Sequence, residues 1–171
     1  MHNYEELEAN AFPGQFSRYD MEVLVPEVEK IKPEGIYLEI GTDRGRSLSI
    51  ARKVSHPSVE IVGVDIQDNP KVPGTKFIKS ASCAASLSWK HFIDVLFIDG
   101  DHSYLGCFID IQSWYLLVRE GGVMLFHDCD ETSPGVMRAV AEFVDTHKES
   151  VKEFKLFKRT DKNTSMALVR L

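Results

Sequence analysis

Cysteine is scarce in this chain of 171 residues: there are three, Cys83, Cys107 and Cys129, and no two of them form a C-x-x-C pair. Such a set gives neither a disulfide framework nor a zinc motif, and it fits a reducing compartment. Long apolar runs are also lacking, since Asp110 interrupts the most apolar stretch, residues 104–118, and a membrane span needs about 20 apolar residues. The first residues are acidic and lack the basic-then-apolar order of a secretory signal. We therefore expect a cytoplasmic location.

An excess of positive charge is lacking as well. Lys and Arg number 20 against 26 for Asp and Glu, which gives a net charge of −6. This balance argues against nucleic acid or an anionic membrane as a partner, because electrostatic capture of either needs an excess of positive charge. The basic residues within 148–162 are expected to form a solvated face. No repeat is found, and the composition and length are ordinary for one folded domain.

Five apolar runs are typical of buried strands, and each ends near a small, acidic or histidine residue. They cover residues 36–40, 60–64, 75–79, 93–98 and 122–126. Helical periodicity is found from Asp20 to Ile31, after Gly45, over residues 104–118 and after the Ser133-Pro134 pair. Two more strands are expected over 153–158 and 165–171. Because continuous apolar runs indicate strands covered on both faces, the predicted class is α/β: a Rossmann-like, doubly wound, mostly parallel seven-stranded sheet with helices on both faces, in a single domain.

Ligands of such a sheet bind beyond the carboxyl ends of the strands. The first of these ends carries E-I-G-T-D-R-G over residues 39–45. Gly41 and Gly45 let the backbone approach a ligand, and the following helix offers free N–H groups. Asp43 stands where a dinucleotide-binding loop has its middle glycine, and a carboxylate there would repel a pyrophosphate. The turn therefore suits a ligand with a cationic centre and an amino-acid tail, and a nicotinamide-dependent oxidoreductase is the disfavoured alternative.

The acidic-x-Gly-x-x-x-Gly form of this turn resembles the first motif of the class I S-adenosylmethionine-dependent methyltransferases. The resemblance implies that the turn surrounds the methionine part of S-adenosylmethionine, that the acid ending the second strand binds the ribose hydroxyls, and that the segment after the third strand contacts adenine. An ionised carboxylate can accept both hydroxyl protons. The cofactor-binding residues implied are Glu39, Gly41, Thr42, Gly45, Ser47, Asp65, Ile66, Ala81, Ser82 and Asp99.

Ionisable groups crowd the ends of the fourth and fifth strands, in I-D-G-D-H-S-Y over residues 98–104 and F-H-D over 126–128. Burying ionisable groups costs free energy, so a cluster of them at the strand ends is expected to be solvated or to have a function. We therefore predict a site here. Both strings resemble the small-molecule O-methyltransferase branch that includes caffeoyl-CoA, catechol and sugar O-methyltransferases. In its metal-dependent members, acids at these places hold Mg²⁺, which implies a metal site at Asp99, His127 and Asp128. Because imidazole suits Mn²⁺ or Zn²⁺ better than Mg²⁺, the need for a divalent cation and its identity stay open.

His102 follows Asp99 by three residues, as the general base does in some sugar members of this branch. Its ordinary pKa of about 6.5 permits proton abstraction at neutral pH. The predicted catalytic residues are therefore His102 and Asp99, and capping of the helix near Ser103 is the other interpretation of His102. We predict a methyltransferase (EC 2.1.1 class) that O-methylates a small-molecule acceptor, without a nucleic-acid or membrane partner; a homodimer stays open.

Residues 20–171 would form the methyltransferase domain, and residues 1–19 an N-terminal segment that covers the acceptor pocket or contacts a partner subunit. A cofactor-binding module without catalysis is a further alternative. Only nine residues, 66–74, separate Asp65 from Thr75, fewer than a helical crossover needs. A shortened edge of the sheet could be a subunit contact or a sign of lost activity.

Overall fold

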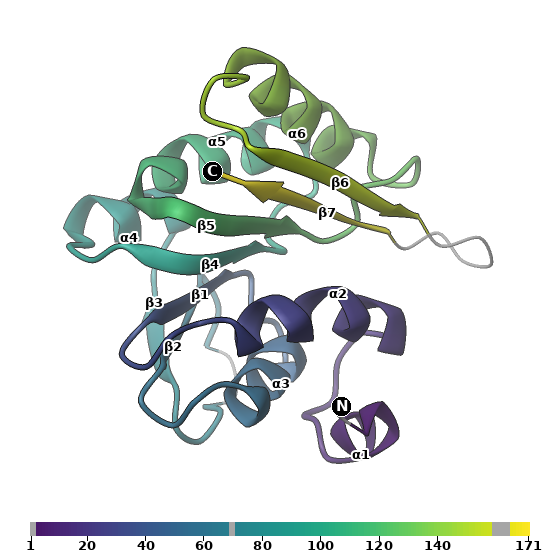
Figure 1. The fold of residues 1–171 in the computed structure, drawn as a ribbon, viewed down its shortest axis with the longest axis vertical. Helices are drawn as coiled ribbons and strands as arrows, with labels where there is room; N and C mark the ends of the chain where they lie inside the picture. Colours follow the sequence, from purple (N-terminus) through teal and green to yellow (C-terminus); the bar gives the residue numbers. More distant parts are fainter. Residues whose placement is uncertain (1–2, 69–70, 159–164) are drawn as a thin grey trace.

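The chain forms one sheet, which the computed structural model describes over residues 3–68, 71–158 and 165–171 (Figure 1). Its seven strands within these residues follow the spatial order β3-β2-β1-β4-β5-β7-β6. They are β1 (Ile36–Ile40), β2 (Glu60–Asp65), β3 (Lys76–Lys79), β4 (Ile93–Ile98), β5 (Val118–Phe126), β6 (Glu153–Lys158) and β7 (Ser165–Arg170). The first five are parallel to one another, and β7 is antiparallel to both β5 and β6. The predicted fold class is confirmed.

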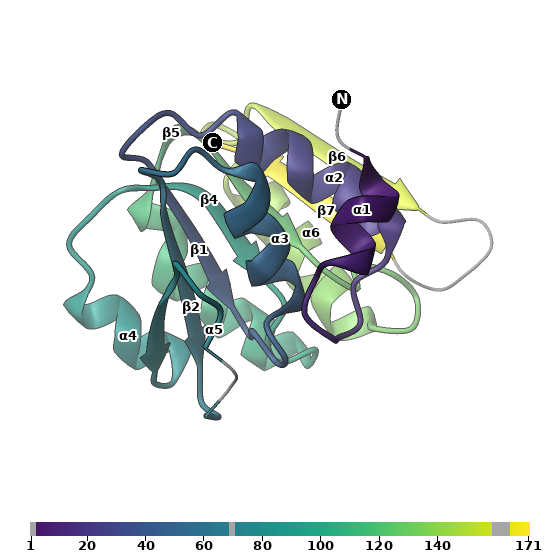
Figure 2. The ribbon, with the colours of Figure 1, turned by 90° about the horizontal axis from the view of Figure 1, so that it is seen from below.

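Helices cover both faces of the sheet (Figures 1 and 2). Those of the described residues are α1 (Tyr4–Ala9), α2 (Arg18–Glu29), α3 (Arg46–Val54), α4 (Ser82–Ser88), α5 (Tyr104–Trp114) and α6 (Pro134–Thr146). Side chains alternate across each strand, so Leu38 packs in the core under α4, α5 and α6, whereas Tyr37 packs in the core under α1, α2 and α3. No helix within the described ranges is long and apolar enough to cross a membrane.

The boundary between α5 and β5 differs from the prediction of one helix over 104–118. Helix α5 ends at Trp114, a single 3-10 turn follows over Tyr115–Leu117, and Val118 already belongs to β5. The register of β5 against β4 shifts between the pairs of Ile93 and Val95. This irregularity lies beside Gly121, whose positive φ of 75° a glycine adopts without cost. The apolar periodicity therefore continues beyond Trp114, the last residue of α5.

Two other expectations are partly met. The helix expected from Asp20 begins at Arg18 and contains Pro26. Ser133 stands at the N-cap of α6 as predicted, but within the described residues its side chain makes no capping hydrogen bond, and Pro134 begins the helix. The described part of the link between β2 and β3 contains no helix, and Val72 from this link is buried. The residues described on either side of 69–70 thus lack the helix that is usual in a crossover between parallel strands.

Candidate functional site

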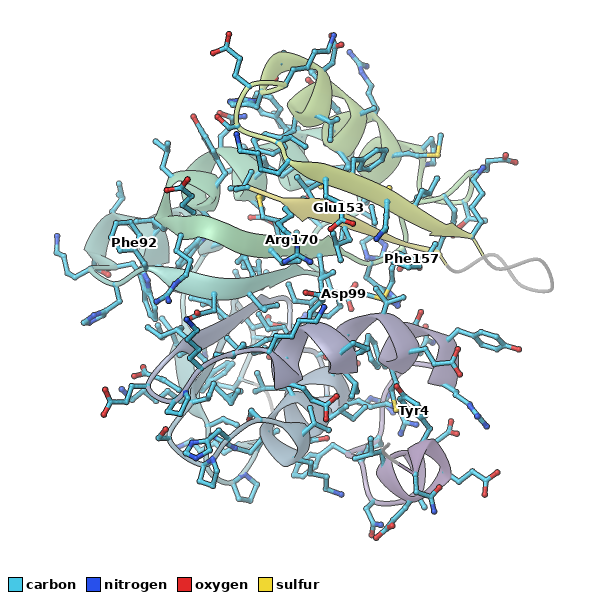
Figure 3. All side chains as sticks on the ribbon, viewed as in Figure 1. Tyr4, Phe92, Asp99, Glu153, Phe157 and Arg170 are labelled. Atoms are coloured by element: carbon cyan, nitrogen blue, oxygen red, sulfur yellow. The ribbon has the colours of Figure 1, made fainter. Side chains whose placement is uncertain are left out.

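The carboxyl ends of the central strands meet in one row. The N–H of Gly41 donates to the carbonyl of Val64 (2.9 Å), and the N–H of Asp99 donates to that of Ile40 (2.9 Å). The N–H of His127 donates in the same way to the carbonyl of Ile98 (3.1 Å). Because these bonds continue the parallel ladders, the polar residues after β1, β2, β4 and β5 lie side by side. Figure 3 shows the labelled Asp99 at the centre of this edge.

The turn after β1 has the conformation that its glycines permit. Gly41 has a φ of 80°, and a Cβ at this position would collide with the backbone carbonyl of Asp99. Gly45 has a φ of 79° and is the N-cap residue of α3. Between them, Asp43 also has a positive φ, 39°. Only glycine fits so tight a passage between β1 and β4, and the free N–H groups of α3 face the space beyond the turn.

Asp65 holds this turn. Its Oδ2 accepts hydrogen bonds from the N–H groups of Thr42 (2.9 Å) and Asp43 (3.2 Å), and its Oδ1 accepts one from Gln67 (2.9 Å). Ile66, beside it, is exposed. The predicted ribose-binding acid is therefore also the residue that shapes the first turn.

Glu39 is fully buried beneath the turn. Its Oε2 accepts a hydrogen bond from the hydroxyl of Tyr37 (2.6 Å), and its Oε1 accepts one from Ser47 (2.7 Å). Burial raises the pKa of Glu39 to about 8, because the two hydroxyls only partly offset the desolvation and the charge of Asp99 adds to it. A carboxyl with such a pKa readily loses its proton when a cationic ligand binds beside it.

The segment after β3 brings Ala81 and Ser82 to the same edge. Ala81 is the exposed N-cap residue of α4. The Ser82 hydroxyl accepts a hydrogen bond from Trp114 Nε1 (2.8 Å). Asp110 of α5 is buried beside them, and burial raises its pKa to about 6, with Ser82 opposing the shift and Asp101 adding to it. The sequence had shown Asp110 only as an interruption of an apolar stretch.

Asp99, His102 and Asp128 form a cluster, in which donor atoms from all three lie within 4.8 Å of one another. His102 Nε2 is 3.6 Å from Asp99 Oδ1 and 3.5 Å from Asp128 Oδ2. The nearby carboxylate of Asp99 is the main reason why the pKa of His102 is raised. The helix-capping interpretation of His102 does not describe the structure, because Ser103 is the N-cap residue of α5 and accepts from the N–H of Gly106 (3.0 Å).

His127 lies behind this cluster and is 94% buried, its exposed fraction being 6%. Its Nδ1 is 3.3 Å from Asp99 Oδ1 and 3.2 Å from Asp128 Oδ2, yet neither ring nitrogen makes a hydrogen bond within the described residues. Burial alone would lower the pKa of His127, but Asp128, Asp20 and Asp99 together raise it to about 12. Three carboxylates therefore surround this imidazole.

Asp20 is the residue of this group that sequence reasoning missed. Its Oδ2 lies 3.5 Å from His127 Nε2 and also accepts hydrogen bonds from the N–H (2.6 Å) and hydroxyl (2.7 Å) of Ser17. The bond from the N–H of Ser17 and the one from the N–H of Asp20 to Ser17 Oγ (3.4 Å) together form the capping box of α2. The S-x-x-D spacing from Ser17 to Asp20 was the available signal for the cap, but only the tertiary structure brings the carboxylate to His127.

The N-terminal segment also contacts His127. Phe16 is buried and stacks on His127, with ring centroids 5.7 Å apart. The guanidinium of Arg46 donates to the carbonyls of Phe16 (2.9 Å) and Phe12 (3.1 Å). Residues before α2 are therefore packed against both α3 and the end of β5.

The donor atoms around Asp99 fit a metal ion. Asp99 Oδ1 and Asp128 Oδ2 are each 3.2–3.6 Å from both His102 Nε2 and His127 Nδ1. Ligands about 2.0–2.1 Å from a tetrahedral ion are separated by ~3.3–3.4 Å, which the distances of His127 Nδ1 from the two carboxylates, 3.3 and 3.2 Å, match. The buried Nδ1 of His127 without a hydrogen-bond partner fits the same interpretation, because a metal would occupy it. The carboxylates and imidazoles together suit Mn²⁺ or Zn²⁺.

A cavity of about 370 Å³ lies between α2 and strands β6 and β7. Its walls come from Tyr19, Asp20, Glu22, Val23, Phe157, Lys158, Ser165 and Met166. Asp20 is thus shared between the cavity and the contact with His127. The edge of the sheet consequently offers a glycine turn, a cluster of carboxylates and imidazoles, and a neighbouring cavity.

Comparison with known sequences gives one family and one relative. Residues 38–129 match a family model described as a methyltransferase domain, which is more than half of the chain. The protein R132 of Acanthamoeba polyphaga mimivirus, itself described as uncharacterized, is 32% identical over 135 residues, which cover 66% of this chain and 61% of R132. The chain therefore spans about three fifths of the length of that relative.

Solved structures share the fold at low sequence identity. An O-methyltransferase from Bacillus cereus in complex with SAH has a TM-score of 0.72 and 14% identity, covering 98% of this chain and 90% of its own. MycE, a methyltransferase of the mycinamycin biosynthetic pathway in complex with Mg, SAH and mycinamycin VI, has a TM-score of 0.73 and 16% identity, covering 98% of this chain and 54% of its own. An rRNA methylase from Streptococcus thermophilus has a TM-score of 0.68 and 11% identity, covering 88% of this chain and 95% of its own.

Proposed function

The chain belongs to the family of methyltransferase domains, and from this premise we propose that it transfers the methyl group of S-adenosylmethionine to a hydroxyl of a small molecule. The observation that carries the proposal is the cluster of Asp99, His102 and Asp128 at the strand end next to the glycine turn. A cofactor in the turn and an acceptor at the cluster would be neighbours. Catalysis would then come mainly from positioning the two reactants.

The glycine turn supports cofactor binding. Gly41 lets the turn pass close to the backbone of Asp99, and Glu39 beneath the turn is a carboxyl that a cationic sulfonium or ammonium would ionise. The carboxylate of Asp65, at the end of β2, would bind the ribose hydroxyls, and Ala81 and Ser82, after β3, would contact the adenine. Asp43, with its carboxylate in the turn, disfavours a pyrophosphate and hence a nicotinamide cofactor.

His102 is the proposed general base. It is about half exposed, with 47% of its side chain accessible, and its Nε2 faces Asp99 and Asp128. An acceptor hydroxyl that displaced this contact could give its proton to Nε2. Both carboxylates would then stabilise the imidazolium formed. Asp128 has a positive φ of 50°, a strained conformation that aims its side chain at the cluster.

A divalent cation is part of the proposal. Asp99, Asp128 and His127 would hold it, which leaves His102 Nε2 free for the acceptor proton, and His127 would have to release its own proton first. Such an ion, when bound, lowers the pKa of an acceptor hydroxyl. The imidazole of His127 favours Mn²⁺ or Zn²⁺ over Mg²⁺.

The N-terminal segment, residues 1–19, is proposed to wall the acceptor site. Phe16 stacks on His127, and Tyr19 lines the neighbouring cavity. The segment is tied to α3 through Arg46. These contacts support a cover built from the chain itself.

Calorimetry with S-adenosylmethionine and S-adenosylhomocysteine tests the first step, and no binding to the folded protein would overturn the proposal. The second step is tested by transfer of labelled methyl groups to a panel of catechols, phenols and sugars, with Asp99→Asn as the inactive control. Binding without transfer in every case would favour the non-catalytic module. Labelling of added ribosomal RNA and of none of the small molecules would contradict the small-molecule acceptor, which the net charge of −6 supports.

A further inference from the structure

Helix α5 has an apolar outer face. Leu105 and Ile109 on the helix, and Leu116 in the 3-10 turn that continues it, are all exposed. Their spacing of four and seven residues places them on one side of the helix, together with the exposed Gln112. The opposite side of α5 packs on the sheet. Because a helix that is apolar on every side is normally buried, this outer face is expected to be covered.

Charged residues are nearly absent from this part of the molecule. Helices α4 and α5 together contain a single charged residue, Asp110, which is buried. Helix α6, in contrast, exposes Arg138 and Asp145, and α3 exposes Lys53. The outer surface of α4 and α5 therefore differs from that of the other helices in the way that the centre of a protein interface differs from ordinary surface, by its lack of charge.

Two further apolar side chains extend the face beyond α5. Leu87 on α4 and Phe92 just before β4 are exposed, and Figure 3 shows the labelled Phe92 at the periphery of the molecule. Helix α4 packs against α5. The rings of Trp89 and Trp114, 5.9 Å apart, hold the segment that leads to Phe92 against the C-terminal end of α5. Leu87 and Phe92 therefore continue the apolar surface of α5.

The size of this surface is that of an interface core. Its five large apolar side chains are between 39% and 84% exposed and present on the order of 500 Å² of apolar surface, which is near the upper limit for the largest patch of a monomer. A standard interface buries about 800 Å² on each partner, including a polar rim. The face is thus large enough to form the apolar centre of a dimer interface. We call it the α5 face: Leu87, Phe92, Leu105, Ile109, Gln112 and Leu116.

The α5 face is complementary to itself. If two copies of α5 lie antiparallel across a two-fold axis, Leu105 of one copy is opposite Leu116 of the other, and Ile109 is opposite Gln112. Steps of four, three and four residues are also the spacing of the seam between paired helices.

The charges at the two ends of the helix agree with this orientation. Asp101, just before α5, is exposed, and the exposed Lys90 lies in the segment that Trp89 holds at the other end of α5. Antiparallel pairing brings the Asp101 end of one copy to the Lys90 end of the other, where opposite charges attract. Parallel pairing would bring like charges together.

We propose that the α5 face binds the α5 face of a second copy of this chain, so that the protein is a two-fold symmetric dimer with antiparallel α5 helices at its centre. The inference is independent of the proposed function, because it holds equally for a catalytic and a non-catalytic protein.

Sedimentation equilibrium of the full chain at micromolar concentrations tests the dimer. The wild type should dimerise, and Leu105→Glu and Leu116→Glu should each raise the dissociation constant at least tenfold, because each places a carboxylate in the apolar centre. Gln112→Leu should lower it, because an apolar side chain then faces Ile109. Leu156→Glu, at an exposed leucine on β6, is the matched control and should dimerise like the wild type. Circular dichroism verifies that each variant is folded.

A pair of charges tests the orientation. Positions 105 and 116 are roughly 16 Å apart along the helix, too far to pair within one copy. Leu105→Glu combined with Leu116→Lys should therefore recover most of the dimerisation, whereas Leu105→Glu combined with Leu116→Glu should stay monomeric. A wild type that is monomeric at every concentration, a dimer that Leu105→Glu and Leu116→Glu leave intact, or equal dissociation of the two double variants would overturn the inference. Binding of S-adenosylhomocysteine to the same samples separates the two proposals, since its loss would refute the function and leave the dimer standing.

Discussion

The Oδ2 atom of Asp20, in the first turn of α2, lies 3.5 Å from Nε2 of His127 at the end of β5. Asp20 is 4% exposed and His127 6%. The pKa of Asp20 is lowered: burial would raise it, but His127 and Ser17 outweigh that effect. The contact links the N-terminal helix to the cluster around Asp99, because the other ring nitrogen of His127 faces Asp99 and Asp128.

Asp20→Asn should loosen this cluster without unfolding α2. The amide oxygen of Asn can still accept from the N–H of Ser17, so the variant removes the charge and keeps the cap. We expect turnover and the affinity for Mn²⁺ or Zn²⁺ to fall about 10- to 100-fold, and the free energy of unfolding to fall by about 2 kcal/mol. Glu22→Gln, which alters an exposed pair in the same helix, is the control. Wild-type metal affinity and turnover in Asp20→Asn would show that Asp20 acts only as a cap.

His102→Ala should reduce turnover about 10²- to 10⁴-fold, the range for loss of a general base. The affinity for S-adenosylhomocysteine should be unchanged, because His102 lies outside the glycine turn. The pKa of His102 is raised by Asp99, so wild-type turnover should fall as the pH drops through a value above 6.5, and the variant should lack this acidic limb. His91→Ala, at an exposed histidine before β4, is the control. Unchanged turnover in His102→Ala would remove the proposed role.

Gly41→Ala should disrupt the turn after β1. The new Cβ would collide with the carbonyl of Asp99, and the φ of 80° is unfavourable for alanine. We expect a loss of about 3 kcal/mol or more in urea unfolding and no measurable cofactor binding. Gly121→Ala is the matched control: its φ is 75°, but nothing lies within 4 Å of the added Cβ, so it should lose only about 1 kcal/mol. Equal losses in the two variants would contradict the close packing of β1 against β4.

Glu39 should make the apoprotein less stable as the pH rises. Burial raises its pKa from 4.5 to about 8, so between these values the folded state holds a proton that the unfolded chain has released. The free energy of unfolding therefore falls with increasing pH through this window, by on the order of 1 kcal/mol per pH unit. Glu39→Gln has no such proton, and its stability should fall less steeply between pH 5 and pH 8. The contribution of His127 to the pH dependence of stability is the same in wild type and in Glu39→Gln. Asp43→Asn, in the exposed part of the same turn, should keep the wild-type slope, and parallel profiles of wild type and Glu39→Gln would refute the shift.

Local sequence patterns were sufficient for the order of the elements. Short apolar runs followed by Gly41, Asp65, Asp99 and His127 predicted where strands end, because such residues cannot continue a buried strand. They failed at the start of β5, where the apolar helix pattern continued through Tyr115 into Val118. Periodicity records which side chains are buried, and it does not record where the backbone hydrogen bonds change partner.

The sequence by itself determined the parallel sheet, the glycine turn and the row of polar strand ends, since these depend on residues close together in the chain. Only the tertiary structure decided which side chains meet across that row. Asp20 reaches His127 because α2 packs over the end of β5, although 107 residue positions separate them. His102 turns toward Asp99 and Asp128, while Ser103 takes the cap. Such contacts depend on how helices pack on the sheet, and this packing is set by the burial of the whole chain.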